Sequence, residues 1–199
     1  MAKRSAKADK KSQRGRLRIV AGNWRSRLLD LADVPGLRPT SERIRETLFN
    51  WLTPRIAGAR CLDLFAGTGA LGLEALSRGA TSAVFVEKSA LAANTLRKSI
   101  AALNTDAATV FETDASGFLT NVDCGEFDLV FLDPPFADER LGDLCRLLQK
   151  QSILAADASV YIEEDRSRPV LELPDGWRTL KTGNAGNVRY SLVRVGIIS

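Results

Sequence analysis

Residues 62–72 read Leu-Asp-Leu-Phe-Ala-Gly-Thr-Gly-Ala-Leu-Gly, and this stretch decides the fold. An apolar strand runs into a turn that holds two glycines, and the turn opens directly into a helix. Gly67 and Gly69 allow a tight turn and let a ligand approach without a Cβ in the way. The helix start supplies unpaired N–H groups. The stretch predicts a ligand-binding turn of an α/β sheet, although Gly67-x-Gly69-x-x-Gly72 is a weak pattern by itself.

The chain around this turn alternates between short apolar strands and helices. Strands are expected at 61–65, 83–86, 108–111, 127–132 and 160–163, and helices at 70–78, after Ser89 and around 141–148. Such alternation predicts a parallel sheet covered on both faces. Two final strands, 177–181 and 188–195, are expected to form a hairpin that adds an antiparallel strand at the sheet edge.

The N-terminal region has a different composition. Residues 1–14 are rich in Lys, Ala and Ser without a hydrophobic period, which predicts a disordered basic tail. Two short strands, 17–21 and 24–29, flank Gly22 and Asn23 and predict a β-hairpin within residues 15–34. A helix is expected to begin at Thr40 or Ser41, and residues 35–199 form the predicted main domain.

Charge is unevenly distributed along the chain. Residues 1–27 carry ten Lys and Arg side chains against Asp9, a net charge of +9, whereas the whole chain carries +4, so the remainder carries −5. A basic arm on a mildly acidic body is typical of a polyanion partner such as RNA or DNA. A solubilising tail explains the charge alone equally well. The arginines of the hairpin interleave with Trp24, so one of its faces is expected to meet phosphates.

Composition excludes several classes of function. The chain has no histidine, which removes Ser-His-Asp and Cys-His chemistry and the common zinc sites. Its three cysteines, Cys61, Cys124 and Cys145, are far apart and form no metal-type pair, so we expect buried reduced thiols and no metal. No apolar run reaches membrane-spanning length and no secretory signal is present, so a cytoplasmic protein without a membrane partner is expected.

Acidic residues follow the strands at the positions where a nucleoside ligand needs them. Glu87 lies 20 residues after Gly67, at the end of the second strand, where a carboxylate can accept both ribose hydroxyls. Asp114 and the Ala115 backbone follow the third strand and can reach an adenine edge, although Asp114 can instead cap the next helix. Asp63 can offset a positive charge. No proton-relay residue suited to hydride transfer accompanies the turn, so S-adenosylmethionine is favoured over a nicotinamide cofactor.

The fourth strand ends in Asp133-Pro134-Pro135-Phe136. The prolines fix φ and remove backbone donors, which leaves carbonyl acceptors of little freedom. Asp133 adds a charged acceptor, and Phe136 adds a ring on which a base can stack. These residue types are suited to binding a planar group that carries an exocyclic amine. The alternative interpretation is a proline-rich turn after a core strand, with no role in binding.

Taken together, these motifs resemble the RsmD family, bacterial 16S ribosomal RNA (guanine-N2)-methyltransferases. The resemblance covers about residues 15–195. It is carried by residues 18–25, by 36–40 with Arg43, Arg45, Glu46, Leu48, Phe49 and Trp51, by 63–78, and by 133–136.

The resemblance implies a class I methyltransferase fold, with a Rossmann-like seven-stranded sheet whose last strand is antiparallel and lies beside the fifth. It implies a catalytic set of Asp133, Pro134, Pro135 and Phe136. It implies S-adenosylmethionine contacts from Arg38, Thr40, Asp63, Phe65, Ala66, Gly67, Thr68, Gly69, Glu87, Lys88, Asp114 and Ala115. It implies that Arg16, Arg18, Trp24, Arg25 and Arg27 bind 16S rRNA or the small ribosomal subunit, and we expect a monomer.

Other functions fit the residues themselves. An amine methyltransferase acting on adenine in DNA, on another RNA or on a glutamine side chain can use the same four residues. A non-catalytic RNA-binding protein on a Rossmann-like body is a more distant alternative, because it leaves the glycine turn, Glu87 and Asp133 unused.

Overall fold

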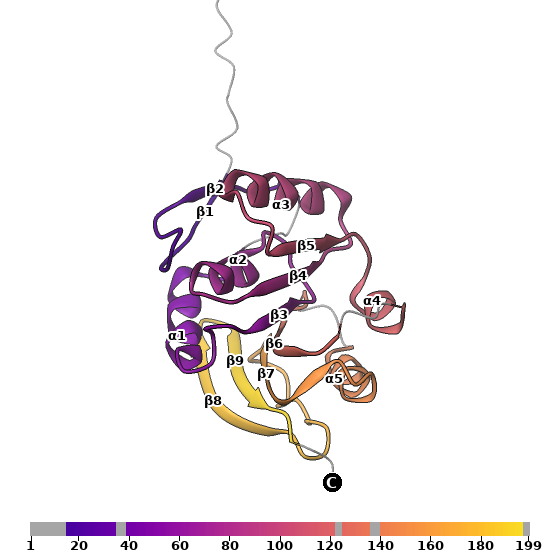
Figure 1. Cartoon of the computed structure of the whole chain (residues 1–199). Coiled ribbons are helices and arrows are strands. Elements are labelled where there is room, and N and C mark those ends of the chain that lie inside the picture. Colours follow the sequence, from indigo (N-terminus) through magenta and orange to yellow (C-terminus); the bar gives the residue numbers. More distant parts are fainter. Residues whose placement is uncertain (1–14, 35–38, 122–124, 136–139, 197–199) are drawn as a thin grey trace, which may run out of the picture.

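A single mixed sheet organises the computed structural model, which describes residues 15–34, 39–121, 125–135 and 140–196. The strand order is β5-β4-β3-β6-β7-β9-β8 (Figure 1). The strands are β3 (Arg60–Asp63), β4 (Ser82–Val86), β5 (Ala108–Phe111), β6 (Phe127–Leu132), β7 (Leu154–Asp165), β8 (Arg178–Ala185) and β9 (Val188–Arg194). The first five pair in parallel, whereas β9 runs antiparallel to both β7 and β8. The predicted α/β fold is confirmed, and the antiparallel strand lies between β7 and the edge strand β8.

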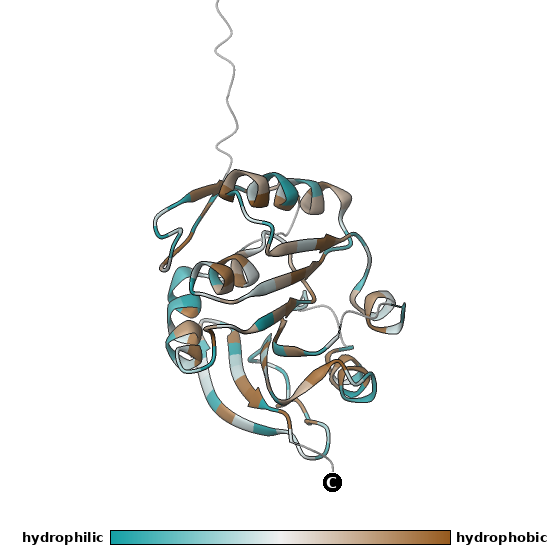
Figure 2. Ribbon diagram, viewed as in Figure 1, coloured by the Kyte–Doolittle hydropathy of each residue, from teal (hydrophilic) through white to brown (hydrophobic). Residues whose placement is uncertain are grey.

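Five helices cover the two faces of the sheet. They are α1 (Glu42–Leu52), α2 (Ala70–Ser77), α3 (Ala90–Leu103), α4 (Ala115–Asn121) and α5 (Leu141–Lys150). One buried cluster joins α1, α2 and α3 to alternate strand residues such as Phe131 and Tyr161. The other joins α4 and α5 to the residues between them, such as Leu132 and Ile162. The brown strands in Figure 2 lie between helices whose outer faces are teal, as expected for a sheet buried on both faces.

Several predicted boundaries differ from the structure. The Oγ atoms of Ser41 and Ser89 accept from the N–H groups of Ile44 and Ala92, so both helix starts are confirmed. The first sheet strand ends at Asp63 rather than 65, and β7 begins at Leu154 rather than 160. The last hairpin is longer than predicted because Gly183 stays in the ladder opposite Tyr190, where an added Cβ would lie 2.4 Å from the tyrosine ring.

The N-terminal hairpin is present, with shorter strands than predicted. β1 (Arg16–Arg18) and β2 (Leu28–Asp30) pair antiparallel, and residues 19–27 form a wide loop between them. Ile19 still bonds to the opposite arm, donating to the Arg27 carbonyl and accepting from Ser26 N–H, and the tip of the loop then bonds to α2. Ser77 Oγ accepts from Trp24 N–H at 3.0 Å, and the Ser77 carbonyl accepts from Asn23 N–H at 2.7 Å. Gly22, at φ 82°, permits this approach, because a Cβ there would lie 1.8 Å from the Ser77 carbonyl oxygen.

A buried ion pair joins the hairpin, α1 and α2. Arg45 is 1% exposed and Glu74 is fully buried. Glu74 accepts from Arg45 at 3.0 Å, from Arg78 at 2.8 Å, and from the N–H groups of Val20 and Ala21 at 2.8 and 3.0 Å. Arg45 also donates to the carbonyls of Thr40 and Arg18. We call Arg45 and Glu74 the hub; it fixes the hairpin loop relative to the segment that holds Thr40.

Two expectations from composition can be compared with the described residues. Cys61 and Cys145 are buried free thiols, as expected, whereas Cys124 lies outside the described residues. Among the described residues, the helices are too short or too polar for any of them to span a membrane.

Candidate active site

The predicted site residues converge where the sheet order reverses. β4 and β6 lie on opposite sides of β3, so the connections leave β3 and β6 in opposite directions. Open α/β sheets bind ligands at the carboxyl ends of the strands at such a point. Asp63, Glu87, Asp114 and Asp133 end or follow four neighbouring parallel strands, so the structure brings them to one edge.

The glycine turn is held by the carboxylate predicted to meet ribose. Gly67 and Gly69 have φ values of 52° and 77°, which L side chains rarely adopt. One oxygen of half-buried Glu87 accepts from Gly67 N–H at 2.8 Å, and the other accepts from Ser89 N–H at 2.7 Å. The turn and Glu87 therefore form one preorganised unit. Phe65 and Thr68 beside it are half-buried, Ala66 is buried and Lys88 is exposed.

Asp63 lies beneath the turn rather than on its surface. It is 2% exposed and accepts from Gly72 N–H at 3.2 Å, so it anchors the first turn of α2. Burial, with smaller contributions from the negative charges of Asp133 and Glu87, raises its pKa to about 7, although the hydrogen bond from Gly72 N–H opposes the shift. Because Asp63 is buried beneath the turn, it could influence a positively charged ligand only through its negative charge and not by direct contact.

Asp114 caps a helix, the alternative that the sequence left open. Its Oδ1 accepts from Gly117 N–H at 3.0 Å at the start of α4. Ala115, the first residue of α4, is buried. The other carboxylate oxygen of Asp114, Oδ2, accepts no hydrogen bond from the described residues, so it remains available as an acceptor.

Asp133 lies just past β6 and is half-buried. Its Oδ2 accepts from the Thr40 hydroxyl at 3.2 Å, which joins two predicted site residues that are 93 positions apart. Burial raises the pKa of Asp133, and the Thr40 hydrogen bond partly opposes this. Pro134 is buried and Pro135 is exposed. Phe136 and Arg38 lie outside the described residues.

A further carboxylate, Glu163, was missed by the sequence interpretation. It is 4% exposed, lies near the end of β7 and accepts from the Tyr161 hydroxyl at 2.7 Å. Burial raises its pKa, and the charge of Asp133 raises it further. An acidic residue at the carboxyl end of an apolar strand was the available signal, the same signal that singled out Asp133.

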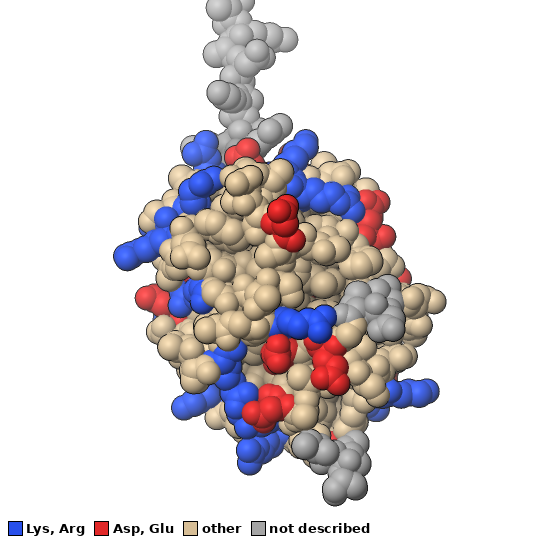
Figure 3. Space-filling model, in the orientation of Figure 1, with Lys and Arg blue, Asp and Glu red and all other residues tan. Residues whose placement is uncertain are grey.

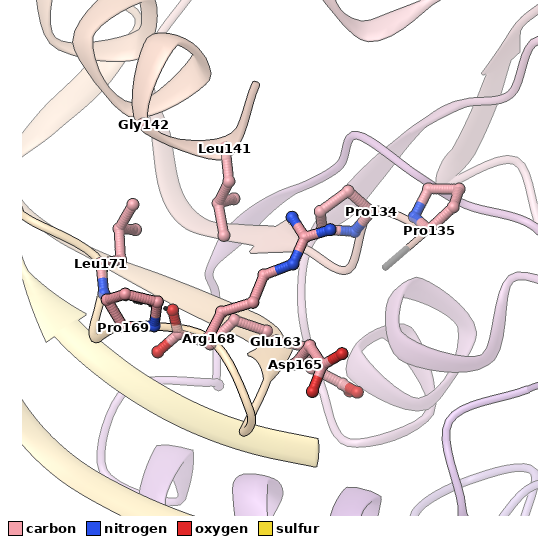
Figure 4. Close-up of a pocket in the computed structure, with 10 residues that line it drawn as sticks. Pro134, Pro135, Leu141, Gly142, Glu163, Asp165, Arg168, Pro169 and Leu171 are labelled. Atoms are coloured by element: carbon pink, nitrogen blue, oxygen red, sulfur yellow. Dashed lines mark hydrogen bonds between the residues drawn. The ribbon is translucent and has the colours of Figure 1, made fainter. Parts of the chain in front are cut away.

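A cavity adjoins Glu163 and Pro134, the residue that follows Asp133. It measures about 200 Å³ and is lined by Pro134, Pro135, Leu141, Gly142, Glu163, Glu164, Asp165, Arg168, Pro169 and Leu171. Figure 4 shows Arg168 extending toward Pro134, with Leu141 pointing in from the start of α5. The candidate site thus comprises a preorganised glycine turn and, beyond β6, a cavity whose lining includes three carboxylates and several apolar side chains.

Comparisons with known proteins agree with this arrangement. The model of a family described as "Conserved hypothetical protein 95" matches residues 17–194. The chain is 43% identical over 178 residues to the Escherichia coli K12 protein "Ribosomal RNA small subunit methyltransferase D", covering 89% of each chain. The chain belongs to the RsmD family.

Solved structures support the fold assignment of this RsmD-family protein. A putative methyltransferase, yhhF of Escherichia coli, is 40% identical with a TM-score of 0.85, covering 92% of this chain and 99% of that chain. SMU.776, described as a putative methyltransferase complexed with SAH, is 15% identical with a TM-score of 0.62, covering 77% of this chain and 48% of that chain. The fold is that of methyltransferases, and the more distant match bears on the fold alone.

The predicted RNA-binding residues of this family member differ in whether their side chains already bond to other residues of the protein. Arg18 is held by both oxygens of Glu42, Arg27 donates to the Ala102 carbonyl at 2.7 Å, and Arg16 lies 4.0 Å from Asp30. Trp24 is half-buried against the core. Arg25 is exposed and forms no ion pair with any described residue. Figure 3 shows basic side chains over the upper end of the molecule, where Figure 1 places the hairpin and α3.

Proposed function

We propose that this protein transfers a methyl group from S-adenosylmethionine to the exocyclic 2-amino group of a guanine in 16S ribosomal RNA. The observation that carries the proposal is the placement of two half-sites at one sheet edge. One is the Gly67–Gly69 turn with Glu87, and the other is Asp133 with Pro134. The printed name of the Escherichia coli relative supports the choice of small-subunit rRNA.

The turn fits S-adenosylmethionine by its chemistry. A positive φ at Gly67 and Gly69 opens the backbone to a ligand, and the Glu87 carboxylate provides acceptors for ribose hydroxyls. Burial raises the pKa values of Asp63 and Asp133, and the charge of Asp133 raises that of Asp63 further, so a nearby cationic ligand would favour their ionised forms. When bound, S-adenosylmethionine supplies a methyl group carried on a positively charged sulfur.

Asp133 and the Pro134 carbonyl are proposed to hold the amine. The lone pair of a guanine 2-amino group is delocalised into the ring, which makes the nitrogen a poor nucleophile. Hydrogen bonds from the amine to Asp133 and Pro134 favour a pyramidal nitrogen and stabilise the positive charge that develops on it. As the nitrogen gains the methyl group it gives up one proton, for which Asp133 is the adjacent acceptor. No histidine is needed for this chemistry.

The proposal is tested by product analysis. The protein is incubated with methyl-labelled S-adenosylmethionine and small-subunit RNA from a strain that lacks this gene, both naked and assembled. We expect N2-methylguanosine after digestion to nucleosides. N6-methyladenosine would move the activity to the adenine alternative, and absence of label with intact cofactor binding would favour the non-catalytic RNA-binding alternative.

Asp133→Ala provides the residue-level prediction. We expect transfer to fall by about 100-fold or more, since it removes the group that stabilises the charge of the transition state. Affinity for S-adenosylhomocysteine, measured by calorimetry, should change little because the glycine turn and Glu87 remain. Near-normal turnover would exclude the amine-binding role of Asp133.

The hairpin loop is proposed to contact RNA through Arg25. The arm as a whole is unsuitable for deletion, because Leu17, Ile19 and Leu29 are buried in the core. Arg25→Ala should weaken RNA binding and lower the slope of log affinity against log salt by about one. Arg27→Ala is the comparison, since its guanidinium is anchored to Ala102. An unchanged slope for Arg25→Ala would exclude a phosphate contact.

A further inference from the structure

Glu163 of β7 lies beside the position just past β6 that Asp133 occupies. Leu132 and Ile162 are register partners in the parallel β6–β7 pair, and each carboxylate comes one residue later. Asp133 accepts from Thr40, and Glu163 accepts from Tyr161. Two acidic side chains therefore end adjacent strands side by side.

Glu163 has no cationic partner in the part of the chain that the structure describes. Among the described residues no Lys or Arg forms an ion pair with it, whereas the next residue, Glu164, pairs with Arg189. A buried carboxylate that receives only neutral hydroxyl donors from the described residues is costly to ionise. A residue selected only for packing at this position would be apolar, so the carboxylate calls for a ligand that brings hydrogen-bond donors.

The cavity at Glu163 has apolar side chains in its lining against which a planar ring can pack. Its apolar lining comes from Pro134, Pro135, Leu141, Pro169 and Leu171, and Glu163 contributes to its polar part (Figure 4). A base removed from its stack is read through its Watson–Crick edge while apolar groups cover its faces. The prolines join this cavity to the proposed amine site at Asp133.

We propose that Glu163 is the residue that selects guanine, by accepting the N1–H of the base while Asp133 accepts from its 2-amino group. This inference rests on the proposed function. The guanine edge carries two neighbouring donors, N1–H and the 2-amine, which match two neighbouring acceptors. Adenine carries an acceptor, N1, beside its 6-amine, so an ionised Glu163 opposes it.

The protonation of Asp133 and Glu163 is consistent with recognition of guanine by Glu163. In the free protein, burial and the charge of Asp133 raise the pKa of Glu163. Donors from guanine and a nearby positive charge both favour the ionised form. Binding of the base is thus expected to release a proton from the pair.

Replacing the base tests the inference without altering the protein. The methylated nucleotide is first located in small-subunit RNA and then replaced by 2,6-diaminopurine riboside, which keeps the 2-amine but has no N1–H. We expect kcat/KM of the wild-type enzyme at alkaline pH to fall about 10- to 100-fold. Equal rates on guanine and 2,6-diaminopurine would overturn the inference, even with guanine methylation and its dependence on Asp133 intact. A wild-type enzyme inactive on guanine would overturn the proposed function as well.

Combining Glu163→Ala with the base replacement gives a double-mutant cycle, which measures the coupling between the carboxylate and N1–H. We expect the variant to lose about 10- to 100-fold on guanine but to discriminate little between the two bases, because the coupling between N1–H and the carboxylate is gone. Asp165→Asn is the matched control, since it changes another carboxylate of the cavity that already accepts from Ser167 N–H at 2.8 Å. Affinity for S-adenosylhomocysteine should be unchanged in both variants. A Glu163→Ala enzyme that still discriminates between the bases, or an equal loss of discrimination in Asp165→Asn, would overturn the inference.

Discussion

The hub and the Asp133–Glu163 pair are both built from buried ionisable groups, yet their charges are balanced differently. The hub joins opposite charges, and Glu74 receives donors from two arginines and two backbone N–H groups. The pair joins like charges, and its donors among the described residues are the neutral hydroxyls of Thr40 and Tyr161. The hub is therefore satisfied within the protein, whereas the pair lacks donors that a ligand can provide.

This difference separates a structural role from a ligand-binding one. Burial lowers the pKa of Arg45 and Glu74 opposes that shift, so the guanidinium stays charged and paired. Burial raises the pKa of both site carboxylates, and no described cation opposes it. Thr40 connects the two regions, since its carbonyl accepts from Arg45 and its hydroxyl donates to Asp133.

Breaking the hub should have the largest effect on stability. Glu74→Gln leaves the Arg45 guanidinium buried without its countercharge, which costs about 3–5 kcal/mol of unfolding free energy. Urea denaturation measures the loss. Glu112→Gln is the matched control, because its ion pair with Arg97 is about 40% exposed on both sides and such pairs contribute about 0–1 kcal/mol. Equal losses in the two variants would contradict a structural role for the hub.

The sequence predicted the sheet and the site residues that follow local patterns, but not the residues that only packing brings together. Short apolar strands and the Gly67–Gly69 turn are local signals, so the parallel strands and the position of Glu87 followed from them. The hub was not predicted because Arg45 and Glu74 lie 29 residues apart in two helices, and only packing brings them together. Their appearance in polar helical positions is typical of solvent-exposed faces.

Glu163 shows the same limit within the site. Its position after an apolar strand is a local signal, but its closeness to Asp133 depends on the register of β6 and β7. The hairpin also follows this rule. Its pairing was predicted, but its wide loop depends on Ser77 and Glu74 of α2, which no local pattern indicates.

Removing the charge of Glu163 should change the unfolding free energy less than Glu74→Gln does, and should increase it rather than decrease it. The folded-state pKa of Glu163 lies above its unfolded value, so the folded protein binds more protons and its stability falls as pH rises through the folded pKa. Glu163→Gln removes this penalty. We expect the variant to gain at least about 1 kcal/mol relative to wild type at alkaline pH and to show a flatter dependence, since one pKa unit corresponds to about 1.4 kcal/mol. Urea denaturation across pH measures both, and parallel pH profiles would show that Glu163 is not titrating in this range.

The smallest expected effect concerns the hydroxyl that supports Glu163. Tyr161→Phe removes one neutral hydrogen bond, which costs about 0.5–1.5 kcal/mol at neutral pH. Because that hydrogen bond lowers the pKa of Glu163, its loss should raise the pKa further. If guanine binding needs the ionised carboxylate, the rise of kcat/KM with pH should then begin at a higher pH in the variant, while affinity for S-adenosylhomocysteine is unchanged. A purely structural tyrosine would lower stability without moving the pH profile, so this variant distinguishes support of a reactive carboxylate from simple packing.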